Sequence, residues 1–165
     1  RKGTLTMLNA FVEFVSEHRK CKLLTVGWGE DLAQSKRLVR KKGLSKNILF
    51  LPLMSHHRIL KYYAAADVIL DQFAVGGYGL IGTESLASNS PLITYLSDAS
   101  KQQFEVGPPV ANAKSRVEIL SRLNQLSDKR ERLKFVQKGR AWLNKYHNAN
   151  EIISQYIALY KKLMA

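Results

Sequence analysis

The segment GGYGLIGTESLASNSPLITY (76–95) places glycines, one acid and an apolar run in an order that suits nucleotide binding. Glycines let a backbone approach a phosphate closely, and a helix start presents unpaired N–H groups and the positive end of a dipole. Glu84 stands further into the predicted helix, where a carboxylate does not bind phosphate but can accept hydrogen bonds from sugar hydroxyls. These residue types indicate a site for a nucleotide or a nucleotide-sugar.

The segment is expected to lie in an α/β domain, because short apolar strands alternate with helices along the chain. Such alternation with short links is typical of a Rossmann-like parallel sheet with helices on both faces. The strands are predicted at residues 22–27, 47–52, 67–71 and 91–95. The helices are predicted at residues 4–18, 30–42, 55–66, from the glycine loop to 88, and then at 115–127, 129–146 and 149–163, which form a helical C-terminus.

The stretch 97–114 is the linker-like part of the sequence, but it lies inside this pattern, so residues 1–165 are predicted to form a single domain. In open parallel sheets, ligands bind outside the carboxyl ends of the strands. Those ends are expected at 27–30, 51–53, 71–79 and 95–98. The glycine loop before Glu84 therefore lies on the expected binding edge.

The composition fits a globular domain with an anionic partner. Of 165 residues, 45% are hydrophobic and 24% charged, while the net charge is +13. This excess favours nucleic acid, an anionic membrane or a phosphorylated substrate. A single cysteine, Cys21, excludes an internal disulfide and fits a cytoplasmic, reducing compartment. No apolar run in the sequence is long enough to span a bilayer, and no signal peptide is visible.

The segment YAAADVILDQF (63–73) with YGLIGTESLASNSPLITY (78–95) resembles the donor-binding region of family-4 retaining glycosyltransferases of the GT-B fold. RKGTLTMLNAF at the start resembles the family's first helix region, and LLTVGWGED resembles the pattern that the family carries after its second strand. KGRAWLNKYHNANEIISQYIALYKKL resembles its C-terminal helices. The resemblance implies the C-terminal, nucleotide-sugar-binding half of a two-domain enzyme. It also implies that the first strand of the domain precedes residue 1 and that the acceptor domain lies outside this chain.

The resemblance assigns Glu84 to the second glutamate of the family's E-x7-E motif, where it would accept hydrogen bonds from the ribose hydroxyls. The first glutamate of that motif would fall at Gly76 and is absent, so recognition of the donor sugar must differ. Asp71 and Gln72, at the preceding strand end, are candidates to take over part of that recognition. Capping of the strand end is an equally good interpretation of both residues.

The same resemblance places the diphosphate at the backbone of Gly77, Tyr78, Gly79 and Leu80. It makes Lys2 the catalytic cation beside the diphosphate, because negative charge builds on the departing phosphate as the glycosidic bond breaks. Gly27 and Leu51, at the ends of two strands, would line the base.

No metal and no cofactor are expected, since the sequence has neither an Asp-x-Asp pair nor a Cys/His cluster with zinc spacing. The adjacent His56 and His57 are interpreted as a polar helix start, because neighbouring residues point in different directions. Two alternatives stay open: a sugar-nucleotide epimerase of the same fold, and a basic nucleic-acid-binding module. The second has no helix-turn-helix signature or aromatic sheet motif to support it, so nucleic acid is not the expected partner.

The predicted activity is transfer of a sugar, with retention and without metal, from a nucleotide-diphosphate sugar to an acceptor. The full-length parent would be the enzyme, and this chain alone is expected to bind nucleotide and catalyse nothing. Basic stretches at 36–46 and 130–140 leave room for an anionic membrane surface or a lipid-linked acceptor. The expected location is cytoplasmic, at the periphery of the inner face of a membrane.

Overall fold

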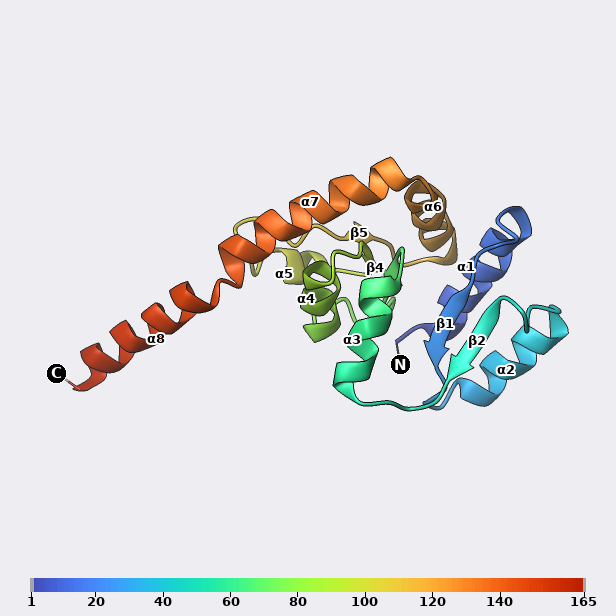
Figure 1. Ribbon diagram of the computed structural model, residues 1–165, viewed down its shortest axis with the longest axis horizontal. Helices are drawn as coiled ribbons and strands as arrows, with labels where there is room; N and C mark the ends of the chain where they lie inside the picture. The colour runs from blue at the N-terminus through green and yellow to red at the C-terminus, as the bar shows by residue number, and fades with distance from the viewer. Residues whose placement is uncertain (1, 165) are drawn as a thin grey trace.

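The computed structural model describes residues 2–164 and alternates helices with short strands (Figure 1). The strands are β1 (Leu23–Val26), β2 (Ile48–Leu51), β3 (Ile69–Leu70), β4 (Leu92–Thr94) and β5 (Ala111–Asn112). The helices are α1 (Thr4–Glu17), α2 (Leu32–Lys41), α3 (His56–Ala65), α4 (Leu80–Ala87), α5 (Asp98–Lys101), α6 (Arg116–Ser127), α7 (Lys129–Tyr146) and α8 (Ala149–Met164).

The strands of the described residues are divided between two parallel sheets. β1 pairs with β2, with Leu23 opposite Ile48, while β3, β4 and β5 pair in that order. β1 and β3 are not paired with each other in residues 2–164. The predicted α/β class, with parallel strands and helices on both sides, is confirmed, and its strands lie in two short sheets.

The core joins these parts through α1. One face of α1 is buried, and α1 packs along α6, whose Ile119 is fully buried. Fully burying each large apolar side chain is worth about 1.5–3 kcal/mol relative to leaving it exposed. The residues of α1 that form this face are Met7, Leu8, Ala10, Phe11, Phe14 and Val15. The α1–α6 contact therefore fixes the helix that follows Lys2.

The prediction that 97–114 is linker-like is wrong, because this stretch contains α5 and β5. The side chain of Asn112 accepts a hydrogen bond from Leu96 N at 2.7 Å and donates one to Leu96 O at 3.2 Å. Ala113 N also donates to Thr94 O at 3.0 Å. These bonds attach the segment to the end of β4, so it continues the sheet.

The last helix, α8, extends away from the rest of the molecule (Figure 1). Its amphipathic pattern agrees with the prediction, and none of the residues described in α8 is buried. No helix among residues 2–164 combines the length and the hydropathy needed to cross a membrane.

Candidate functional site

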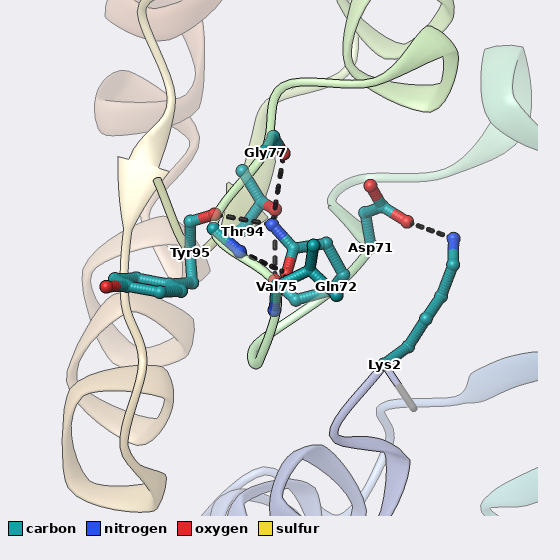
Figure 2. A network of polar contacts seen from close by, with 8 residues as sticks. Lys2, Asp71, Gln72, Val75, Gly77, Thr94 and Tyr95 are labelled. Carbon is teal, nitrogen blue, oxygen red and sulfur yellow. Dashed lines mark hydrogen bonds and ion pairs between the residues drawn. The ribbon is translucent and has the colours of Figure 1, made fainter. Parts of the chain in front are cut away.

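Lys2 lies at the carboxyl end of β3, where it meets Asp71 (Figure 2). Phe73 N donates a hydrogen bond to Lys2 O at 2.8 Å, which fixes the lysine backbone beside the strand end. Lys2 Nζ lies 2.7 Å from Asp71 Oδ1, and 58% of the lysine side chain is exposed against 7% of the aspartate. The cation is thus held by a nearly buried acid but stays accessible to a ligand.

Gln72 is buried at the base of the glycine loop, residues 76–79 (Figure 2). Its Nε2 donates to Tyr95 O at 2.5 Å and Gly77 O at 3.1 Å. Its Oε1 accepts from Val75 N at 2.9 Å and Gly76 N at 3.1 Å. The amide is therefore saturated within the protein and holds the loop in place. A sugar contact through Gln72 stays a prediction, and it would require breaking these bonds.

Gly76 occupies a position that accepts no side chain. Its φ is 80°, in the left-handed region, and a Cβ built there would lie 2.8 Å from Tyr95 Cε1 and 3.0 Å from Ser97 Cβ. The acid that the E-x7-E motif would place here would collide with the end of β4. The packing of Tyr95 and Ser97 therefore gives a physical reason for the absence of that acid.

Tyr78 turns its side chain into the protein. Its ring lies so close to Gly82 that a Cβ there would overlap it, and it packs edge-on against Trp142 at 5.5 Å and Phe104 at 6.0 Å between ring centroids. Burial raises the pKa of the Tyr78 hydroxyl to about 12, so it stays protonated at neutral pH. The ring anchors the glycine loop to α7, so any contact of Tyr78 with a phosphate would be made by its backbone.

The start of α4 is open to a ligand. Gly79 is the N-cap residue, and no side chain caps the helix start. A Cβ at Gly77 or Gly79 would meet no atom within 4 Å, and 70% of Leu80 is exposed. First-turn N–H groups in such a setting are suited to an anion. The predicted phosphate-binding residues thus lie at one accessible helix N-terminus.

Glu84 lies one turn further along α4, and its carboxylate contacts His56, the first residue of α3. His56 Nε2 lies 2.5 Å from Glu84 Oε1. The interpretation of His56 as only a polar helix start missed this partner. Burial raises the pKa of Tyr63, and the charges of Glu84 and Asp71 raise it further.

Gly27 and Leu51 meet at the ends of β1 and β2, where Gly27 N donates to Leu51 O at 2.7 Å. A Cβ on Gly27 would lie 3.2 Å from that oxygen, which explains why a glycine fits there. Both residues belong to the sheet other than the one that carries the glycine loop. Their proposed contact with the base stays a prediction.

Residues 2–164 hold no group of three or more His, Cys, Asp or Glu side chains placed to bind a metal ion. Independence of a metal stays a prediction. The positive charge that the site offers comes from Lys2 and from the N-terminal end of the α4 helix dipole.

Known proteins match this chain in sequence. Residues 1–142 match the family described as glycosyl transferases group 1. Over 101 residues the chain is 30% identical to an alpha-monoglucosyldiacylglycerol synthase of Acholeplasma laidlawii, covering 61% of this chain and 25% of that protein. The chain thus spans about a quarter of the length of this relative.

Solved structures match it in fold. The C-terminal domain of a glycosyl transferase group 1 family protein (LpcC) from Francisella tularensis gives a TM-score of 0.74 at 23% identity, covering 88% of this chain and 80% of that chain. The pneumococcal O-GlcNAc transferase GtfA, solved in complex with UDP and GlcNAc, gives 0.69 at 18% identity, covering 99% and 33%. The predicted C-terminal half of a GT-B fold is confirmed, and the chain belongs to the glycosyl transferases group 1 family.

Proposed function

We propose that the chain is the donor-binding part of a glycosyltransferase that transfers a sugar, with retention and without metal, from a UDP-sugar to an acceptor. The observation that carries the proposal is the arrangement at the carboxyl edge of β3. The accessible cation is Lys2, which contacts Asp71 at the end of that strand. The strand is followed along the chain by the uncapped N-terminus of α4 and, one turn into that helix, by the carboxylate of Glu84. The family match favours sugar transfer over the epimerase and nucleic-acid alternatives.

The arrangement suggests a role for each group. The diphosphate would lie between Lys2 and the backbone of 77–80, where a full positive charge and a helix dipole act together. Glu84 would accept hydrogen bonds from the ribose hydroxyls, and Gly27 and Leu51 would border the base. Lys2 would stabilise the negative charge that grows on the phosphate as the bond to the sugar breaks. Asp71 would hold Lys2 in place until the diphosphate competes for it.

The nature of donor and acceptor is proposed from the relatives. UDP is the nucleotide in the GtfA structure, and the Acholeplasma relative is a glycolipid synthase by name. We therefore infer a uracil nucleotide and a lipid acceptor. The exposed basic residues of α2 and α7 would attract an anionic membrane surface at the cytoplasmic side, with about 1 kcal/mol per well-placed cation. The acceptor domain would come from another part of the parent protein.

Changing Glu84 to alanine is expected to weaken UDP binding by about 1.5–3 kcal/mol, because hydroxyl hydrogen bonds to a charged acceptor are lost. Isothermal titration calorimetry of UDP on the full-length parent measures this. Glu17→Ala, at the exposed end of α1, is the matched control and should bind UDP as the wild type does. Equal affinities of folded wild type and Glu84→Ala would remove Glu84 from the site.

The parent enzyme is expected to keep its activity in the presence of EDTA, because Lys2 and α4 supply the positive charge at the diphosphate. Sugar transfer from a UDP-sugar, measured with and without chelator, checks this. Loss of activity in EDTA that returns on addition of magnesium or manganese would contradict metal independence without affecting the placement of the ribose at Glu84.

A further inference from the structure

His56 contacts the proposed ribose-binding carboxylate directly. Its Nε2 lies 2.5 Å from Glu84 Oε1, and the two side chains are 64% and 12% exposed. An ionised carboxylate has no hydrogen to donate, so the hydrogen in this contact belongs to Nε2 and the imidazole donates it. Within residues 2–164, His56 is the hydrogen-bond partner of the Glu84 side chain, through Oε1. The second oxygen, Oε2, has no hydrogen-bond partner among residues 2–164.

The helix that carries His56 is fixed relative to the helix that carries Glu84. α3 packs against α4. At the far end of α3, the buried Ser90 donates from Oγ to Tyr63 O at 2.7 Å and Ala66 O at 3.2 Å. Ser90 follows the α4 terminus and is itself bonded to Ser85. His56 thus approaches Glu84 from a helix whose C-terminal end is anchored beside the end of α4.

We propose that His56 is a positioning residue that orients Glu84 toward the ribose and so makes the site discriminate between ribose and deoxyribose. The inference rests on the proposed function, because it assumes that Glu84 receives the ribose hydroxyls. A glutamate side chain rotates freely about its terminal bond unless a partner fixes it. With Oε1 bound to His56, Oε2 presents one orientation to the 2′- and 3′-hydroxyls. A preorganised acceptor binds more tightly because less freedom is lost on binding.

The test compares UDP with 2′,3′-dideoxy-UDP by calorimetry on the full-length parent. Wild type should prefer UDP. His56→Ala should weaken UDP by about fivefold, the scale of one hydrogen bond, and leave dideoxy-UDP unchanged. His56→Gln, whose amide can also donate to Oε1, should restore most of the lost affinity. His57→Ala is the matched control, since the neighbouring exposed histidine should affect neither nucleotide.

A double variant separates positioning from general damage. If His56 acts through Glu84, adding His56→Ala to Glu84→Ala should change UDP affinity no further. Full preference for UDP in a folded His56→Ala protein would overturn the inference while leaving Glu84 in its role. An equal loss for both nucleotides, or no rescue by His56→Gln, would also overturn it. A wild type that does not bind UDP, or a Glu84→Ala variant that keeps the preference, would refute the proposed site itself, and with it the inference.

Discussion

Replacing Lys2 with alanine is expected to lower kcat of the full-length enzyme by about 10²–10³, the usual effect of removing one group that stabilises transition-state charge. Lys2 Nζ contacts Asp71 at the carboxyl end of β3, and the glycine loop and the uncapped start of α4 follow that strand along the chain. In the variant, a diphosphate bound there would no longer meet the full positive charge of Lys2 and would interact with the helix dipole alone. The same variant should therefore weaken UDP much more than uridine, which has no phosphate. Initial rates with a UDP-sugar and calorimetry of both ligands measure these effects.

The pair with Asp71 requires a second variant, because Lys2→Ala leaves a nearly buried carboxylate without its partner. Lys2→Ala combined with Asp71→Asn removes that charge and separates lost phosphate binding from an unpaired acid. Lys41→Ala, an exposed lysine at the end of α2, is the control for a general loss of charge. An equal loss for UDP and uridine, or full activity in the double variant, would place the diphosphate elsewhere.

Trp142→Ala is expected to lower the free energy of unfolding by about 3–5 kcal/mol, the range for deleting a large buried aromatic side chain. Only 5% of Trp142 is exposed, and its Nε1 donates to Val106 O at 2.7 Å. Its ring centroid lies 5.1 Å from those of Phe104 and Tyr146. The truncation would leave a cavity between α7 and the loop before β5. Urea denaturation followed by circular dichroism measures the change.

Trp28 supplies the matched control for this prediction, because 74% of it is exposed at the loop after β1. Trp28→Ala should change the free energy of unfolding by less than about 0.5 kcal/mol, as surface substitutions usually do. Trp142→Phe keeps an aromatic ring but loses the bond to Val106, so it should fall between wild type and Trp142→Ala. If Trp142→Ala were as stable as Trp28→Ala, the aromatic contacts would not be holding α7.

Most of the fold was predictable because its long helices have clear apolar periodicity. The helices predicted at 115–127 and 129–146 begin and end within one residue of α6 and α7. β5 was not predictable, since it has two residues and depends on the Asn112 side chain, which bonds to a residue distant in sequence. Short strands defined by such long-range bonds leave no local pattern. The division of the strands into two sheets also has no signature within any one strand.

The site residues could be predicted from the sequence where their type and their place in a motif indicate their role. They could not be predicted where the role depends on a partner that is distant in the sequence. The open helix start after Gly79 and the single acid in α4 follow from the sequence alone. The saturated amide of Gln72 does not, because its partners come from the glycine loop and from Tyr95. His56 was missed for the same reason, since Glu84 is its neighbour only after α3 and α4 have packed.

The packing of Trp142 on Tyr78 gives the protein its own optical reporter. Indole emission depends on the polarity and the movement of the groups around the ring, and one of those groups is the side chain that anchors the glycine loop. The sequence contains two tryptophans, and Trp28 is the solvent-exposed one. Within these 165 residues, Trp28→Phe would leave Trp142 as the single indole emitter. Its fluorescence spectrum would then follow changes in the glycine loop in solution, without a label and without any assay of turnover.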